Sequence, residues 1–199
     1  MNMDTKIQRK IIDNFNEHRS VLDQMLREIN KDIENAGLLM SQTIENGNKI
    51  LWLGNGGSCA DAQHLSAECT GRFRSERAPL NSISLTADTS VITCIGNDYS
   101  FDDIFSRQIE ALVKKGDLVI ALSTSGNSCN VIKALEKCKE LNINSICLSG
   151  NQGGLAKQIA NQNIIVPSRS TARIQEIQIL IGHILIEIVE INLQLCEET

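Results

Sequence analysis

The sequence has little of what marks fibrous, membrane-spanning or secreted proteins. Its 199 residues include two prolines and 3% aromatic residues, and no apolar run reaches the roughly 18 residues of a membrane span. The formal net charge is −5, so no overall basic field attracts nucleic acid or an anionic membrane. The first residues lack the apolar stretch of a signal peptide. We therefore expect one cytoplasmic domain with a substantial core and with no nucleic-acid or membrane partner.

The cysteines do not form a pattern that predicts disulfides or a cysteine-bound zinc ion. Seven are present, which is an odd number, and no CxxC pair occurs among them. Most lie among apolar neighbours, where a free thiol behaves as a small hydrophobic group. We expect reduced, mostly buried thiols in a cytosolic protein.

Beyond residue 48, short apolar runs alternate with segments of helical spacing. The apolar runs are 49–54, 82–85, 117–123, 144–149 and 163–167, and the helical segments are 58–72, 101–114, 127–140 and 153–160. This rhythm is typical of right-handed crossovers between parallel strands. We predict a three-layer α/β/α fold with a five-stranded parallel sheet, in a single domain that spans residues 1–199.

Long helical patterns flank this region at residues 1–46 and from 174 to 195. The first has one apolar stripe, whereas isoleucine and leucine side chains surround most of the second. A helix that is apolar on most sides is buried on most sides, and one chain can hardly cover both helices. We expect both at subunit interfaces, and the alternative is that the second helix is central within one chain.

Two predicted strand ends carry loops that suit a ligand. In parallel α/β sheets, ligands bind outside the carboxyl ends of the strands, and here these ends are followed by 54–58 and 123–128. The glycines of 54–58 allow close approach of the backbone, and Ser58 can cap the next helix. The 123–128 loop has hydroxyls at four of its six positions before a helix, which favours a phosphate. Neither loop is a nucleotide-binding fingerprint.

Three polar side chains are candidates for chemistry. His64 and Glu68 are four residues apart, so a helix places them on one face. They form either an exposed ion pair, half of a metal site, or a general base with a neighbour that tunes it. His183 lies inside the apolar C-terminal helix, where an imidazole is either hydrogen-bonded in the core or functional.

The sequence suggests roles for other polar residues without deciding between them. Gln175 is in an apolar run and needs hydrogen-bond partners if it is buried. His18 on the N-terminal helix is interpreted as structural. Arg72, Arg74 and Arg77 either steer a phosphorylated substrate or form a solvated face.

Several motifs agree in order and spacing with a known family over about residues 10 to 192. They are Gly54-Asn55-Gly56-Gly57-Ser58, Asp61-Ala62-Gln63-His64, Glu68, Gly71-Arg72, Gly96-Asn97-Asp98, Ser123-Thr124-Ser125-Gly126-Asn127-Ser128 and Arg173-Ile174-Gln175-Glu176. Together they resemble the sugar isomerase (SIS) family and, within it, the phosphoheptose isomerases.

This resemblance implies an aldose–ketose isomerase that interconverts sedoheptulose 7-phosphate and D-glycero-D-manno-heptose 7-phosphate through a cis-enediol. The product would supply heptose for bacterial lipopolysaccharide or related glycans. The resemblance also implies a homotetramer with active sites at subunit boundaries. Glu68 and His183 would be the catalytic acid/base pair. The residues that bind substrate would be Asn55, Gly56, Gly57, Ser58, Glu68, Asn97, Asp98, Ser123, Thr124, Ser125, Ser128 and Gln175. A zinc ion would be held by His64, Glu68, Gln175 and His183.

The chain departs from the family pattern at two points. Gln178 stands where a histidine is usual, which we interpret as a change at the surface or behind the ligands. The 168–172 segment lacks an acidic residue that many members carry. The alternatives are a non-catalytic SIS protein of the type that binds the replication initiator DnaA, a phosphosugar sensor, or an isomerase of another phosphosugar. Glu68 and His183 are both retained, which favours the isomerase.

Overall fold

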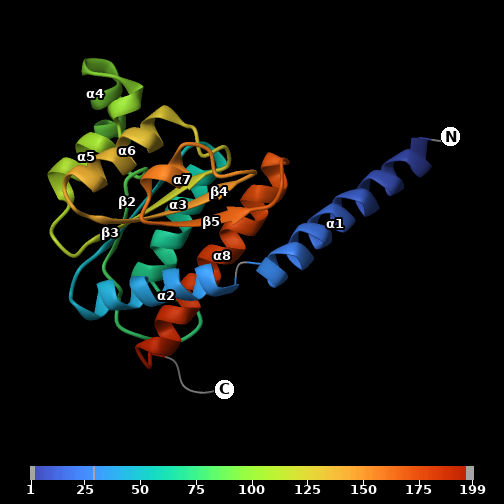
Figure 1. Cartoon of the computed structure of the whole chain (residues 1–199), viewed down its shortest axis with the longest axis horizontal. Coiled ribbons are helices and arrows are strands. Elements are labelled where there is room, and N and C mark those ends of the chain that lie inside the picture. Colours follow the sequence, from blue (N-terminus) through green and yellow to red (C-terminus); the bar gives the residue numbers. More distant parts are fainter. Residues whose placement is uncertain (1–2, 29, 196–199) are drawn as a thin grey trace.

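A sheet of five parallel strands organises the chain in a computed structural model that describes residues 3–28 and 30–195 (Figure 1). The strands are β1 (Ile50–Gly54), β2 (Ser82–Ser84), β3 (Leu118–Ser123), β4 (Asn144–Gly150) and β5 (Gln162–Val166). Their order across the sheet is β2-β1-β3-β4-β5, and every neighbouring pair is parallel. The prediction of a parallel α/β fold from the apolar runs is therefore confirmed.

The helices match the predicted segments to different degrees. The closest matches are α3 (Gly57–Thr70), α6 (Cys129–Glu140) and α8 (Thr171–Asn192). The 101–114 segment divides into η1 (Phe101–Asp103) and α5 (Ser106–Leu112), and 153–160 contains the single turn α7 (Ala156–Ile159). The helix α4 (Thr89–Asp98) was not predicted. Ile95 is its one buried residue, Val91 and Ile92 pack beside it and are partly buried, and Asp88 caps the helix by accepting the Val91 N–H.

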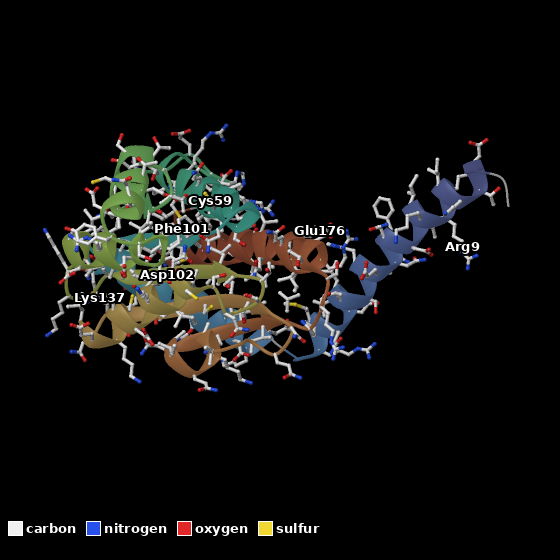
Figure 2. The ribbon with its side chains drawn as sticks, turned by 90° about the horizontal axis from the view of Figure 1, so that it is seen from above. Arg9, Cys59, Phe101, Asp102, Lys137 and Glu176 are labelled. Atoms are coloured by element: carbon white, nitrogen blue, oxygen red, sulfur yellow. The ribbon has the colours of Figure 1, made fainter. Side chains whose placement is uncertain are left out.

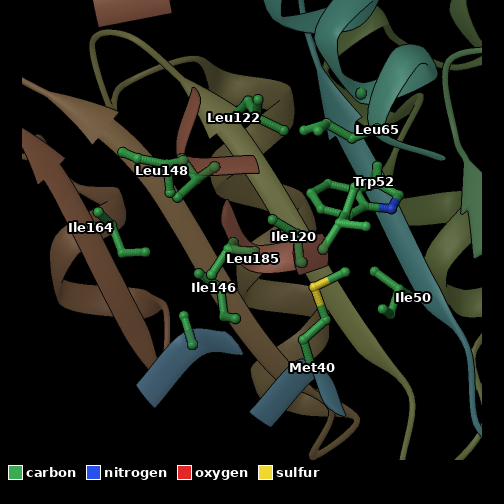
Figure 3. Close-up of a cluster of buried hydrophobic side chains, with 14 of the residues drawn as sticks. Met40, Ile50, Trp52, Leu65, Ile120, Leu122, Ile146, Leu148, Ile164 and Leu185 are labelled. Atoms are coloured by element: carbon green, nitrogen blue, oxygen red, sulfur yellow. The ribbon is translucent and has the colours of Figure 1, made fainter. Parts of the chain in front are cut away.

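Alternate residues of the strands point to opposite faces of the sheet and build two cores. On one face Trp52, Ile120 and Leu148 pack with Leu185 of α8 and Met40, as Figure 3 shows. On the other face Leu53 and its neighbours pack against α4, α5 and α6. Helices thus cover both faces of the sheet, and the loops that follow the carboxyl ends of the strands lie outside these two helical layers.

The N-terminal segment 1–46 contains two helices with different surroundings. The first helix, α1 (Met3–Glu28), extends away from the body, with Arg9 far from the sheet in Figure 2. Apolar residues in its first half are open to solvent in the single chain: Ile12 is 58% exposed and Phe15 73%, whereas Val21 and Met25 near its end are buried. The second helix, α2 (Asn30–Glu45), packs on the chain's own sheet and on α8, and Met40 is fully buried.

One side of α8 is covered by its own chain. Ile181 and Leu185 are buried in the core, and a Cβ on Gly37 of α2 would lie 2.7 Å from the Ile188 side chain. The premise that one chain can hardly cover this helix is therefore corrected for that side, because α2, α3 and the sheet enclose it. Interface packing remains a prediction for α1 and for the open side of α8, where Ile191 is 62% exposed. In the described part of the chain, no helix is long and apolar enough to cross a membrane.

The described cysteines are free, and their burial varies. Cys69, Cys138 and Cys147 are buried, and burial raises the pKa of each thiol to about 12. Cys94 and Cys129 are exposed, which was not expected. Cys59 is half-buried, and Cys196 lies outside the described residues.

Candidate active site

The two predicted ligand loops leave the sheet side by side. From β1 the chain crosses first to β2 on one side, and it later returns to β3 on the other side. Such a reversal of strand order is the usual ligand crevice of an open α/β sheet. Gly54 at the end of β1 pairs with Leu122 of β3, so 54–58 and 123–128 begin at neighbouring points. The topology thus places both loops at one site.

The 54–58 loop turns sharply into α3. Gly56 has a φ of +57°, which favours glycine, and it occupies the N-cap position of the helix. A Cβ on Gly54 would lie 2.7 Å from the carbonyl oxygen of Ser58, so the turn is tightly packed. Ser58 was expected to cap α3, but this prediction is wrong. It lies within the first turn and is buried, because the helix begins at Gly57.

Hydroxyl groups line the 123–128 loop as predicted. Ser123 Oγ accepts the Gly126 N–H at 3.2 Å and lies 3.4 Å from Ser128 Oγ. Ser125 Oγ accepts the Asn127 N–H at 3.1 Å, and Thr124 is half-buried beside it. Ser128 is the N-cap of α6 but makes no side-chain capping hydrogen bond. The N–H groups of the first turn of α6 therefore remain available to an anion.

A pair of asparagines joins the two loops. Asn55 Nδ2 donates to Asn130 Oδ1 at 2.8 Å, and Asn130 Nδ2 donates to Asn55 Oδ1 at 2.9 Å. Asn130 is 2% exposed, so this reciprocal pair is an internal brace between the end of β1 and the start of α6. Sequence reasoning missed Asn130. The signal was an uncharged polar residue in the first turn of a helix that follows a ligand loop.

Three predicted side chains meet on the α3–α8 contact. His64 Nε2 lies 3.0 Å from His183 Nε2 and 3.5 Å from Glu68 Oε1. A hydrogen bond between the two imidazoles requires that one nitrogen carries a proton and the other does not. Burial lowers the pKa of His183, as does the neighbouring His64, while Glu68 opposes this shift. The Phe73 ring stacks on His183 with centroids 5.3 Å apart and an interplanar angle of 16°.

Gln175 and Asp61 are also at this site. The Gln175 amide of α8 reaches the first loop, since a Cβ on Gly57 would lie 2.5 Å from its Nε2. Asp61 Oδ2 is buried and has no hydrogen-bond partner among the described residues. Burial raises the pKa of Asp61, while His64 one turn away opposes the shift. Asp61 was noted only as part of a motif, and the structure makes it a neighbour of the cluster.

Asn97 and Asp98 are not brought to the loops within one chain. Both are exposed at the end of α4, which stands apart from the 123–128 loop in Figure 1. Within the described residues, their side-chain hydrogen bonds join them to each other and join Asp98 to Cys94. Their predicted substrate contact therefore finds no support inside a single chain.

The structure defines the surroundings of Gln178 and His18. Gln178 is not at the surface: it is fully buried, and its Nε2 donates to the Leu148 carbonyl of β4 at 2.9 Å. His18 has a partner, since its Nδ1 lies 2.7 Å from Glu176 Oε2 at the start of α8 (Figure 2 labels Glu176). Arg173 donates to the other carboxylate oxygen of Glu176 at 2.7 Å. This cluster joins α1 to α8.

The expected zinc ligands fit the ion in chemical type and partly in spacing. A tetrahedral zinc ion with bonds of about 2.0–2.1 Å separates its nitrogen and oxygen ligands by roughly 3.3 Å. The His64–His183 distance of 3.0 Å and the His64–Glu68 distance of 3.5 Å are close to this value. Among residues 3–28 and 30–195, no three His, Cys, Asp or Glu side chains already converge to hold a metal ion. Side-chain rotation would thus be needed to complete a site.

Comparison with known proteins shows the family of this chain. The family model of the SIS domain matches residues 14–150, so the chain is a SIS-domain protein. Phosphoheptose isomerase of Aliarcobacter butzleri is 47% identical over 180 residues, covering 90% of this chain and 95% of the relative. That of Aquifex aeolicus is 51% identical over 158 residues, covering 79% and 82%. The structure of phosphoheptose isomerase from Neisseria gonorrhoeae matches with a TM-score of 0.88 and 39% identity, covering 92% of this chain and 98% of the other. The chain belongs to the phosphoheptose isomerase family.

Proposed function

We propose that the chain interconverts sedoheptulose 7-phosphate and D-glycero-D-manno-heptose 7-phosphate. The observation that carries this proposal is the cluster of His64 and Glu68 of α3 with His183 of α8, since α3 begins directly after the first ligand loop. Membership of the family supports the same activity. We further propose that the reaction takes place in the cytoplasm and supplies heptose for lipopolysaccharide or a related glycan.

The phosphate of the substrate is held by the 123–128 loop. Ser123, Thr124, Ser125 and Ser128 offer hydroxyls, and the start of α6 offers N–H groups with the positive end of the helix dipole. Binding energy from this remote group positions the first two carbons of the open-chain sugar. The Asn55–Asn130 pair keeps the phosphate loop in register with the 54–58 loop.

Glu68 and His183 move the protons. Transfer of a carbonyl between adjacent carbons needs a base that takes a proton from one carbon and returns it to the other. Glu68 performs this step. His183 transfers the proton between the two oxygens of the enediol, and its lowered pKa keeps the imidazole able to accept that proton near neutral pH. Phe73 fixes the plane of the His183 ring.

We propose zinc as a cofactor, held by His64, Glu68, Gln175 and His183. The nitrogen and oxygen donors suit this ion, and two of their pairwise separations are near those of a tetrahedral site. Bound zinc would supply a Lewis acid that polarises the substrate oxygens. A carboxylate or an imidazole nitrogen that binds the ion is a weaker base, so Glu68 and His183 each act either as ligand or as proton acceptor at a given stage. Loss of turnover on chelation, with recovery on addition of zinc, tests this proposal.

We propose that the protein is a homotetramer whose sites lie at subunit boundaries. The apolar face of α1 includes Ile12 and Phe15, which are 58% and 73% exposed in the single chain. Asn97 and Asp98 are exposed as well, so they are able to reach the site of a neighbouring subunit. Phe15→Glu should lower the mass measured by light scattering, whereas Asn16→Glu on the adjacent exposed face should not. A monomeric wild-type protein would refute the assembly.

Incubation of the purified protein with sedoheptulose 7-phosphate tests the proposed activity. NMR spectroscopy should show the aldose signal growing until both sugars are at equilibrium. If the protein binds the sugar phosphate without turnover, with or without zinc, it is a sensor. If it neither binds nor converts the sugar, a non-catalytic role such as that of DnaA-binding SIS proteins replaces the proposal.

A further inference from the structure

Arg77 and Glu190 form a buried ion pair that the proposed mechanism does not use. Arg77 lies in the connection between α3 and β2, and Glu190 lies in the last turns of α8. Arg77 Nε donates to Glu190 Oε1 at 2.7 Å, and each side chain is 1% exposed. Sequence reasoning placed Arg77 in a basic cluster that faces solvent or steers substrate. Its burial excludes both roles.

The remaining donors of Arg77 hold the end of α3. Its Nη2 donates to the Glu68 carbonyl and its Nη1 to the Cys69 carbonyl, both at 2.9 Å. The last carbonyls of a helix have no partner within the helix, and α3 ends at Thr70. Arg77 therefore supplies donors to two of these carbonyls, and the Leu80 N–H also donates to that of Cys69 at 3.0 Å. One of the Arg77 donors binds the backbone of Glu68, the residue that we propose as the base.

Glu190 lies on the same helix as His183, the proposed catalytic partner of Glu68. It lies seven residues after His183, which is about two helical turns and brings both to nearly the same face of α8. The adjacent Gly182 lets α8 approach α3 closely, since a Cβ there would lie 2.4 Å from the Leu65 side chain. The α3–α8 contact is thus held at the Leu65–Gly182 contact and at the Arg77–Glu190 pair.

We propose that Arg77 and Glu190 are positioning residues that set the distance between Glu68 and His183. The planar guanidinium binds Glu190 of α8 and two carbonyls of α3 at once, so it fixes the two helices relative to each other. This inference rests on the proposed function for its kinetic part. Its structural part concerns the histidines alone and does not depend on turnover.

Two variants separate positioning from stability. Arg77→Met alone would leave Glu190 buried and unpaired, which is strongly destabilising, so it is a poor test. Arg77→Lys keeps a charge beside Glu190 but replaces the planar fork by a single ammonium group. The double variant Arg77→Met/Glu190→Met removes both charges at similar volume, which is often neutral for a buried ion pair, and it also removes the guanidinium donors from the Glu68 and Cys69 carbonyls. Glu187→Gln is the matched control, because it breaks the exposed Arg74–Glu187 pair on the same helix.

The kinetic readout is the division of the effect between kcat and KM. We expect Arg77→Lys and the double variant to lower kcat at least tenfold with KM within about twofold, because a misplacement of about 1 Å costs up to ~10²-fold in rate. Substrate binding at the 123–128 loop should be unaffected. Glu187→Gln should leave both constants within about twofold of wild type.

The spectroscopic readout uses the three histidines of the chain. In protein labelled with ¹⁵N-histidine and freed of metal, the His64 and His183 ring signals should shift in both variants, while the His18 signals stay in place. Wild-type kcat and unshifted His64 and His183 signals in a folded variant would overturn the proposal. So would loss of folding in both variants, since the pair would then be purely structural. If wild type shows no turnover, the proposed function fails, and the histidine signals alone decide the positioning role.

Discussion

Gly57→Ala probes the contact between the first ligand loop and α8. A Cβ on Gly57 would lie 2.5 Å from Gln175 Nε2 and 2.9 Å from its Cδ and Oε1. Since ordinary van der Waals contact begins at 3.4 Å, the Nε2 atom must retreat by about 0.9 Å from its distance of 2.5 Å. The added methyl group therefore displaces one proposed substrate and zinc ligand by a known amount.

This displacement should reduce turnover more than stability. Gln175 is half-buried, and the atoms that must move are the end of a flexible side chain. Alanine is also favoured over glycine in a helix by up to ~1 kcal/mol, which offsets the cost of the movement. Because a misplacement of about 1 Å costs up to ~10²-fold in rate, we expect kcat/KM to fall by about that factor while Tm changes little.

Gly37→Ala is the matched control for the added methyl group. Its Cβ would lie 2.7–2.9 Å from three atoms of Ile188 in the α2–α8 packing, so overpacking should cost about 1–3 kcal/mol. Turnover of the folded protein should stay at the wild-type value. Thermal denaturation and the NMR assay with sedoheptulose 7-phosphate measure both quantities. Wild-type kcat/KM in Gly57→Ala, or a loss of turnover that merely parallels its loss of stability, would refute the reasoning.

Three further predictions concern the site. Glu68→Gln should lower kcat by about 10²–10⁴-fold and leave phosphosugar binding by calorimetry largely intact; near-full activity would assign the base to another residue. Asn130→Ala removes both hydrogen bonds to Asn55, so the free energy of unfolding should fall by about 1–3 kcal/mol and KM should rise severalfold, whereas an unchanged KM would argue against coupling of the loops. Burial lowers the pKa of His183 below its ordinary 6.5, so below pH 6.5 the unfolded chain binds more protons and the native state loses stability. In urea denaturation with EDTA present, wild type should therefore lose more stability than His183→Asn between about pH 7 and about pH 5. Equal losses in the two proteins would contradict a lowered pKa of His183 in the folded state.

The sheet could be predicted well because its signal is local. A buried parallel strand is a short apolar run, and each of the five runs forms a strand close to its predicted bounds. The helix α4 was missed because its apolar stripe, made of Val91, Ile92 and Ile95, spans little more than one helical turn. The long N-terminal pattern predicted one interface segment, but its second half packs on the chain's own sheet. Periodicity shows that a helix has an apolar side and does not show what covers it.

The sequence by itself predicted the parallel sheet and the composition of the two ligand loops, while the candidate acid, base and metal ligands were assigned only through the resemblance to the SIS family. The sheet and the loops follow from local chemistry, namely apolar runs and hydroxyl and glycine content. Only the tertiary structure showed that the His64 and His183 rings are in direct contact, that Asn130 pairs with Asn55, and that Arg77 is buried against Glu190. Contacts between distant segments depend on how helices pack on the sheet, which side-chain spacing along one element does not encode.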